Sequence, residues 1–277
     1  MVENTLEQYD VISDIHLDFW VKWDSNLAKV EKNILLFIQR IIPKNPSKTL
    51  IIAGDLGHYN KQNVMFLKKL KEYYEHIILV GGNHDFYMIS GKIKNKYRNN
   101  SIKRWNEMKS FASEIEGIHY LDGEIIEIEG TRFGGTTMWY DFSYAKKIWH
   151  DPEEIIRMNW WNVSNDSRLI GGLPFQTLNM FEQEKEKLEN LIDQSDVLIT
   201  HVGPDFIVPS KFKMDKSTSF YFFDGNPYID RIQNKTWIFG HTHERYQYEV
   251  YDCQFINASL GYPNETDEER KIITIQK

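Results

Sequence analysis

Residues 77–85 read IILVGGNHD, and the rest of the chain is organised around this stretch. An apolar, β-branched run that ends in two glycines predicts a buried strand stopping at a tight turn. The turn then presents Asn83, His84 and Asp85 together. An amide oxygen can ligate a metal, an imidazole can shuttle a proton, and a carboxylate can fix the tautomer of the imidazole. The stretch therefore predicts a chemical site at the end of a core strand.

Two earlier strands are expected to end in similar junctions. A short strand at residues 11–13 leads into Asp14 and His16, and a buried strand at residues 49–53 leads into Asp55. Residues i and i+2 of an extended chain point the same way, so Asp14 and His16 can ligate one ion side by side. Taken alone, Asp14 and His16 are more often a surface aspartate and histidine that flank a core isoleucine.

Helical patterns separate these strands. Apolar residues recur at helical spacing over residues 24–42 and 61–75, which predicts amphipathic helices, and a further helix is expected over residues 102–115. The order of elements is thus strand, helix, strand, helix, strand. Parallel α/β sheets place ligands at the carboxyl ends of their strands, so these junctions should open on the same edge.

The second half of the chain repeats the pattern of polar junctions. A hairpin over residues 121–137 is expected to begin a second sheet. A buried strand at residues 196–200 ends at His201, and a core strand at residues 236–239 ends at His241 and His243. A helix is expected over residues 175–192. Strands that would complete the second sheet are expected at residues 246–251, 253–258 and 271–275.

The bulk composition limits the class of protein. The chain has 277 residues, a formal charge of −7 and one cysteine, Cys253, so it cannot form an internal disulfide. The acidic balance disfavours a broad grip on duplex nucleic acid. Residues 1–10 lack a signal-peptide pattern and the apolar runs are too short to cross a bilayer. We expect one cytoplasmic domain over residues 1–277 that does not associate with membranes.

Three stretches have no settled role in this prediction. Residues 138–175 form an aromatic-rich insert, whose rings could pack the insert against the body or stack on a base. Residues 92–104 and 211–216 are rich in lysine and arginine. Each could be a solvated charged loop or a basic rim that attracts a phosphorylated substrate.

Five of the nine histidines lie at these strand ends, and their order resembles the signature of the calcineurin-like metallophosphoesterase superfamily. That signature is Asp-x-His, Gly-Asp, Gly-Asn-His-Asp/Glu, a lone His, and Gly-His-x-His. Here its members are Asp14-Ile15-His16, Gly54-Asp55, Gly82-Asn83-His84-Asp85, His201 and Gly240-His241-Thr242-His243. The resemblance spans residues 10 to about 260. It implies a two-sheet α/β/β/α sandwich with a dinuclear metal centre at its edge.

The resemblance also implies a ligand set. It assigns Asp14, His16 and His243 to a first metal, Asn83, His201 and His241 to a second, and Asp55 to a bridge between them. Carboxylate, imidazole and amide ligands without thiolate suit Mn²⁺ first, with Fe or Zn²⁺ as alternatives. Two metals about 3.5–4 Å apart can lower the pKa of a shared water, and the resulting hydroxide would attack phosphorus in line.

The resemblance gives catalytic roles to two more residues. His84 would contact a phosphate oxygen and protonate the leaving oxygen. Asp85 would hold the other ring nitrogen of His84. Both roles are expectations that the motif order implies.

The sequence narrows the substrate only partly. Serine/threonine protein phosphatases carry Arg four residues after the bridging Asp, and Glu after the motif His, where this chain has Tyr59 and Asp85. The chain is more similar to the phosphodiesterase and small-substrate branches. The expected activity is hydrolysis of a phosphodiester or phosphomonoester, with nucleotides among the candidates. The alternatives are a non-catalytic metal-binding scaffold of the same fold and a nuclease. The oligomeric state is left open.

Overall fold

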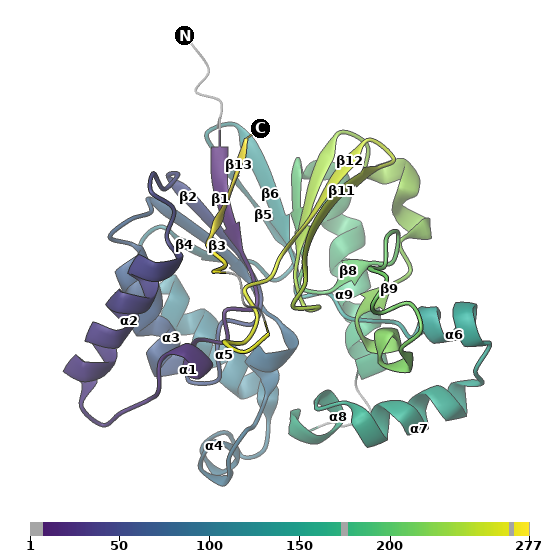
Figure 1. The fold of residues 1–277 in the computed structure, drawn as a ribbon, viewed down its shortest axis with the longest axis horizontal. Coiled ribbons are helices and arrows are strands. Elements are labelled where there is room, and N and C mark those ends of the chain that lie inside the picture. The colour runs from purple at the N-terminus through teal and green to yellow at the C-terminus, as the bar shows by residue number, and fades with distance from the viewer. Residues whose placement is uncertain (1–7, 173–176, 266–268, 277) are drawn as a thin grey trace.

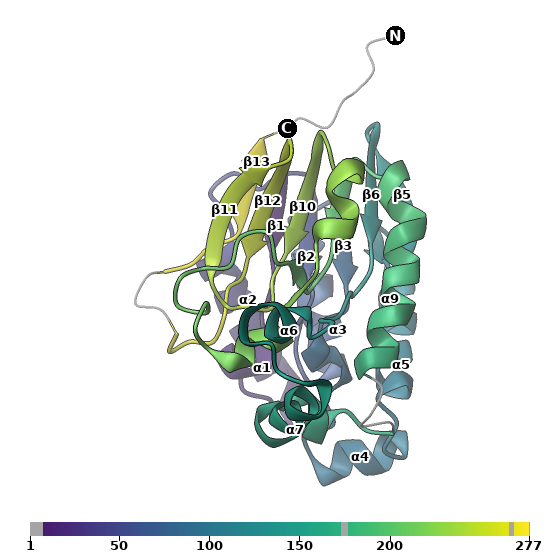
Figure 2. The same ribbon diagram turned by 90° about the vertical axis from the view of Figure 1, so that its right-hand side faces the viewer.

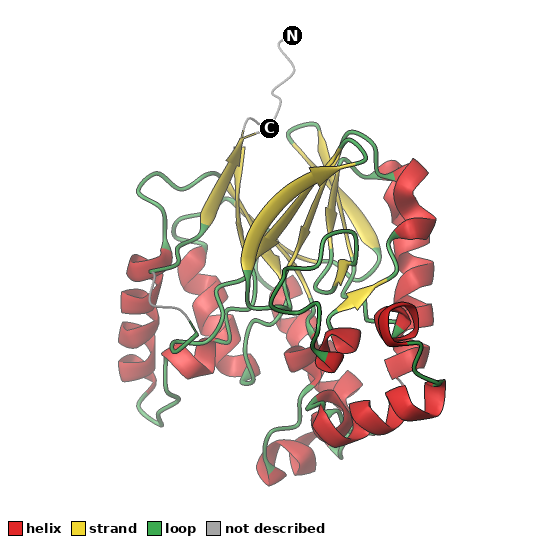
Figure 3. Ribbon diagram, turned by 45° about the vertical axis from the view of Figure 1, so that its right-hand side comes forward, coloured by secondary structure: helices red, strands yellow, loops and turns green. Residues whose placement is uncertain are grey.

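A computed structural model describes residues 8–172, 177–265 and 269–276. Two sheets pack face to face, and helices cover their outer faces (Figures 1 and 3). The first sheet contains, in spatial order, β13 (Ile273–Gln276), β1 (Gln8–Ile12), β2 (Thr49–Ala53), β3 (His76–Val80) and β4 (Ile118–Tyr120). The second contains β11 (Arg245–Val250), β12 (Cys253–Ala258), β10 (Lys235–Phe239), β7 (Val197–Ile199), β6 (Thr131–Gly135) and β5 (Glu124–Ile128). The predicted two-sheet α/β sandwich is confirmed.

The structure contains the four helices predicted from the sequence, together with others that were not predicted. Those of the first half are α1 (Leu17–Trp20), α2 (Leu27–Ile41), α3 (Asn60–Leu70), α4 (Gly91–Tyr97) and α5 (Ser101–Ser113). Those of the second half are α6 (Ser143–Trp149), α7 (Glu153–Val163), α8 (Asp166–Leu169) and α9 (Thr177–Leu191). A short parallel pair, β8 (Gly203–Pro204) and β9 (Phe222–Phe223), lies between α9 and β10 in the chain. No helix in the described ranges combines the length and apolar character needed to cross a bilayer.

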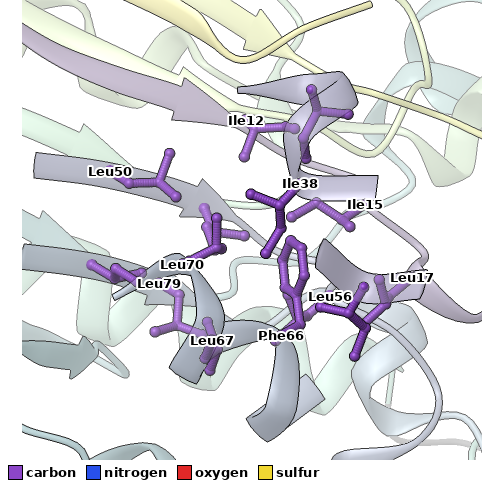
Figure 4. Packing of buried hydrophobic residues seen from close by; sticks show 14 of the residues in the cluster. Ile12, Ile15, Leu17, Ile38, Leu50, Leu56, Phe66, Leu67, Leu70 and Leu79 are labelled. Atoms are coloured by element: carbon purple, nitrogen blue, oxygen red, sulfur yellow. The ribbon is translucent and has the colours of Figure 1, made fainter. Parts of the chain in front are cut away.

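Strand alternation divides the core into layers. In β2, Ile51 faces the second sheet, whereas Leu50 and Ile52 face the helices, because successive side chains point to opposite faces. Figure 4 shows the helical side of this packing, where Ile38 and Phe66 lie among the strand residues. β2 is therefore buried on both faces, which explains its unbroken apolar sequence.

The second sheet has its own outer layer. Figure 2 shows α9 running along the side of this sheet formed by β5 and β6. Most aromatics of the insert are buried in the hydrophobic cluster between this sheet and its helices. Trp139, Tyr140, Phe142 and Trp160 are at most 6% exposed. Of the two alternatives for the insert, packing against the body describes these four rings. Trp161 differs, with 48% of its surface exposed.

The expectation that residues 271–275 complete the second sheet is wrong. β13 pairs antiparallel with β1 in the first sheet, with Tyr9 opposite Ile275. β1 would otherwise leave one backbone edge unpaired, and β13 covers that edge. The hydroxyl of Thr274 also donates to the buried Asp10 carboxylate at 2.7 Å. Strand patterns show that a segment is extended, but they do not show which sheet edge it joins.

An Asp10→Ala variant is expected to lose about 3 kcal/mol or more of unfolding free energy. The carboxylate is fully buried and accepts from Ser47 N (3.1 Å), Ser47 Oγ (2.9 Å), Tyr74 OH (2.9 Å) and Thr274 Oγ1. Its removal leaves several buried donors unpaired. Tyr74→Phe removes one bond and should lose only about 1–2 kcal/mol. Urea unfolding followed by circular dichroism measures both, and an unchanged midpoint for Asp10→Ala would contradict the expectation.

Candidate metal centre

The strand-end residues adopt a backbone conformation that is uncommon for residues with a side chain. Five of the seven predicted ligands, Asp14, His16, Asp55, His241 and His243, have φ between 43° and 71°. Left-handed conformations at non-glycine residues carry strain that the surrounding structure must hold in place. Backbone bonds do so here, since Asp14 N donates to Gly54 O at 3.1 Å and His16 N donates to Asp55 O at 3.0 Å. The sharp turns bring these residues together at one edge of the two sheets.

A first group of ligand atoms converges from β1, β2 and β10. The ligand atoms of Asp14, His16, Asp55 and His243 all lie within 4.8 Å of one another. His16 Nε2 is 2.8 Å from His243 Nε2 and 3.7 Å from Asp55 Oδ2, and His243 Nε2 is 3.5 Å from Asp14 Oδ1. His243 Nδ1 donates to Glu265 Oε2 at 2.7 Å, so Nε2 of neutral His243 has no proton.

A second group meets the first at Asp55. Asn83 Oδ1 is 3.0 Å from His201 Nε2 and 3.1 Å from His241 Nδ1, and these two ring nitrogens are 3.2 Å apart. Asp55 Oδ2 lies 3.3 Å from His201 Nε2. The structure thus brings together every residue that the sequence predicted as a metal ligand.

The tautomers of the second group are set by backbone carbonyls. His201 Nδ1 lies 2.9 Å from Ala53 O, and His241 Nε2 lies 2.8 Å from Phe220 O. A carbonyl only accepts, so these ring nitrogens carry protons, and in the neutral form of each ring the opposite nitrogen is bare. The bare nitrogens face the oxygens of Asn83 and Asp55, and all of these atoms are acceptors.

Converging acceptors of this kind require a cation. Burial lowers the pKa of His201, but the charge of Asp55 outweighs burial and raises that pKa to about 10. A proton can therefore fill the gap in the metal-free chain, and a metal would displace that proton. The donor set of carboxylate, imidazole and amide suits Mn²⁺, Fe or Zn²⁺. The residues fit divalent ions on this chemistry.

The contact expected between Asp85 and His84 is not the one that the structure shows. Asp85 Oδ2 accepts from Gly82 N at 2.8 Å, because the 3₁₀ turn Asn83–Phe86 folds the carboxylate back onto its own loop. Burial, with the charge of Asp55, raises the pKa of Asp85 to about 6.

The ring of His84 is held instead by two residues that the sequence reasoning missed. His84 Nδ1 lies 3.0 Å from His58 Nε2, and His58 Nδ1 lies 2.9 Å from Asp18 Oδ2. Asp18 also accepts from the backbone N–H of His58 at 3.0 Å. Their proximity in sequence to His16 and Asp55 was an available signal. Burial lowers the pKa of His84 to about 3, so its ring is neutral in the metal-free chain.

No residue of the basic stretch 92–104 lines the cavity that opens over this site. Arg104 is buried, and its guanidinium donates to the carbonyl oxygens of Gly57 (2.9 Å), His84 (3.3 Å) and Asp85. It thereby joins the loop after β2 to the loop after β3. Lys211, from the second basic stretch, does line the site and pairs with Glu244 at the surface.

A cavity of about 490 Å³ opens over the ligand groups. The insert contributes one wall through residues 163–166, and the segment between β8 and β9 contributes Phe212 and Tyr221. The ring of Tyr262 covers the ligands, 4.6 Å from the ring of His16 and 4.7 Å from that of His243. The space suits a ligand of small-molecule size with both polar and aromatic neighbours.

Comparisons with known proteins place the chain in a family and identify proteins to which it is similar. A family model described as calcineurin-like phosphoesterase matches residues 9–245. The chain is 24% identical over 276 residues to an uncharacterised protein of Acanthamoeba polyphaga mimivirus, covering 92% of this chain and 91% of that protein. A phosphopantetheinyl hydrolase from Mycobacterium tuberculosis has a similar structure, with a TM-score of 0.65, 17% identity and coverage of 97% and 96%. A putative 5′-nucleotidase from Staphylococcus aureus matches with a TM-score of 0.40, 14% identity and coverage of 97% and 52%.

Proposed function

The chain belongs to the calcineurin-like phosphoesterase family, and from that premise we propose that it hydrolyses a phosphodiester or phosphomonoester at a centre of two divalent ions. The observation that supports this most is the convergence of imidazole nitrogens, carboxylate oxygens and an amide oxygen. A bound cation would satisfy these converging acceptors, several of which line the cavity. Nucleotides are among the candidate substrates because of the size of that cavity and its aromatic residues.

The ligand residues divide between the two proposed ions. Asp14, His16 and His243 would hold one, Asn83, His201 and His241 the other, and Asp55 both. Bound there, the ions would supply an activated water and neutralise the charge that develops on the phosphoryl group. Mn²⁺ is our first choice, and Fe or Zn²⁺ also fits the donor set.

The protein's own contribution to the chemistry centres on His84. Its Nδ1 is engaged by His58, so Nε2 is the nitrogen left for the substrate. An anionic phosphate beside the ring would raise its pKa, and the protonated ring would then donate to the leaving oxygen. Asp18 holds His58 with Nδ1 protonated and Nε2 accepting, which fixes the orientation of the His84 ring.

Hydrolysis of bis-p-nitrophenyl phosphate and p-nitrophenyl phosphate tests the proposal. We expect turnover of at least one ester with Mn²⁺, loss of turnover with chelator, and loss in an Asn83→Ala variant. Asn190→Ala, an exposed change on α9, is the matched control and should behave as the wild type. Diester turnover would direct the search to nucleotide diesters, whereas monoester turnover alone would indicate a phosphatase or nucleotidase.

A metal count completes the test. Two bound ions without turnover of any ester would favour the non-catalytic scaffold, and a count of zero would overturn the proposal. A phosphopantetheinyl ester and a single-stranded oligonucleotide belong in the panel. The first follows from the structural similarity noted above, and the second tests the nuclease alternative.

A further inference from the structure

Asn83 can serve as a metal ligand only if its side-chain amide is turned one way. An amide carries an acceptor oxygen on one side and a donor NH₂ on the other, and only the oxygen can ligate. Asn83 Oδ1 faces His201 and His241 at 3.0 and 3.1 Å. On the opposite side, Nδ2 lies 2.8 Å from Asp166 Oδ1 and 3.1 Å from Tyr87 OH. A carboxylate only accepts, so it determines which side the NH₂ must take.

Asp166 comes from the aromatic insert and is itself held firmly. It is 3% exposed. Tyr87 OH donates to Oδ1 at 2.5 Å and Tyr140 OH donates to Oδ2 at 2.6 Å. Trp160 Nε1 in turn donates to Tyr140 OH at 2.6 Å. The carboxylate therefore has fixed donors on both oxygens, and the one facing Asn83 cannot turn away without leaving a buried donor unpaired.

The backbone fixes the end of the insert against the loop that carries Asn83. Met88 N donates to Leu169 O at 2.7 Å, and Tyr87 forms a bridge with Ile170. A further bond, from Gly171 N to Ser101 Oγ at 2.8 Å, ties the insert to the start of α5. Figure 1 shows α6, α7 and α8 of the insert below the second sheet. The distance between Asp166 and Asn83 is thus set by several independent contacts.

We propose that Asp166 is a positioning residue that holds the Asn83 amide with its oxygen toward His201 and His241. The insert is on this view part of the metal centre, because it completes the half-site formed by Asn83, His201 and His241. The inference rests on the proposed function, which places an ion in that half-site. Groups that orient metal ligands typically contribute about 10–100-fold to metal affinity.

Calorimetric titration of the metal-free full chain with Mn²⁺ tests the inference without measuring activity. We expect wild type to bind two ions and Asp166→Asn to bind one of them about 10–100-fold more weakly. The other ion should bind as in wild type. Asp151→Asn is the matched control, because it makes the same change in the insert at a residue that only pairs with Lys216 near the surface. Equal affinities for both ions in wild type and Asp166→Asn would overturn the inference.

An exchange of the two residues separates orientation from a merely structural role. In the double variant Asn83→Asp/Asp166→Asn, a carboxylate oxygen faces the half-site and an amide NH₂ faces the carboxylate. We expect most of the lost affinity to return. If the double variant does not regain metal affinity, the inference is overturned, because the loss would then come from altered packing of the insert.

A Tyr140→Phe variant tests whether the contact with Asn83, rather than the burial of Asp166 as such, sets the metal affinity. Tyr140→Phe removes one donor from Asp166 and keeps the Asn83 contact, so it should weaken metal binding less than Asp166→Asn. A larger loss in Tyr140→Phe would contradict the proposed role. Wild type that binds no Mn²⁺ would instead overturn the proposed function, which distinguishes the two failures.

Discussion

An Asp55→Asn variant is expected to lose phosphoester hydrolysis by about a thousandfold or more. Asp55 Oδ2 is the oxygen placed between the two ligand groups, 3.7 Å from His16 Nε2 and 3.3 Å from His201 Nε2. Bound metals contribute several kcal/mol of transition-state stabilisation. A loss of about 4 kcal/mol corresponds to a factor of about a thousand in rate. The variant should also bind at most one divalent ion tightly.

Asparagine is the suitable replacement at this position. It matches aspartate in shape and tolerates the left-handed conformation that Asp55 adopts, with φ of 55°. Its Oδ1 can still accept from His84 N, a bond of 2.8 Å in the structure. Asp122→Asn is the matched control, since Asp122 pairs with Lys109 and Lys187 away from the site. Metal content and kcat/KM measure the effect. Full metal content with kcat/KM within about tenfold of wild type would show that Asp55 is no bridge.

The convergence of ligands was predictable because it depends on local patterns. Each core strand is an apolar run, and each polar junction follows such a run directly, as at Asp55 after β2. Parallel pairing of β1, β2 and β3 then forces their carboxyl ends to one edge. The sequence thus predicted which residues meet, while the left-handed turns that aim them were not visible in the pattern.

Pairings between distant segments were not predictable in the same way. The edge to which β13 adds depends on β1, more than 260 residues earlier in the chain. The charge of Arg104 suggested the surface, yet the carbonyl oxygens of two loops hold its guanidinium in the interior. Asp166 lies in a polar stretch after α7 whose contact with Asn83 exists only in the folded chain. A carboxylate or guanidinium can be buried once its partners surround it, and no local period encodes those partners.

A His84→Ala variant is expected to lower kcat/KM about 100- to 10,000-fold for esters with poor leaving groups. This is the usual range for a positioned general acid. The kcat/KM for nitrophenyl esters should fall far less, because nitrophenolate leaves without being protonated. His58→Phe should show the same selectivity with a smaller loss, about 10–100-fold, because it removes the partner of His84 Nδ1. The plot of log kcat/KM against leaving-group pKa should therefore be steeper in both variants than in wild type.

The leaving-group series distinguishes this role from a structural one. A variant that only loosens the fold or the metal centre lowers kcat/KM for all esters alike, so its slope stays that of wild type. His119→Phe is the matched control, because His119 is a half-buried imidazole on β4 whose ring contacts His76 rather than the ligands. A series of substituted aryl phosphates supplies the range of leaving-group pKa. Its members belong to the ester class that the wild type hydrolyses. If His84→Ala keeps the wild-type slope while binding both ions, the leaving oxygen takes its proton from another group and His58 serves only to pack the ring.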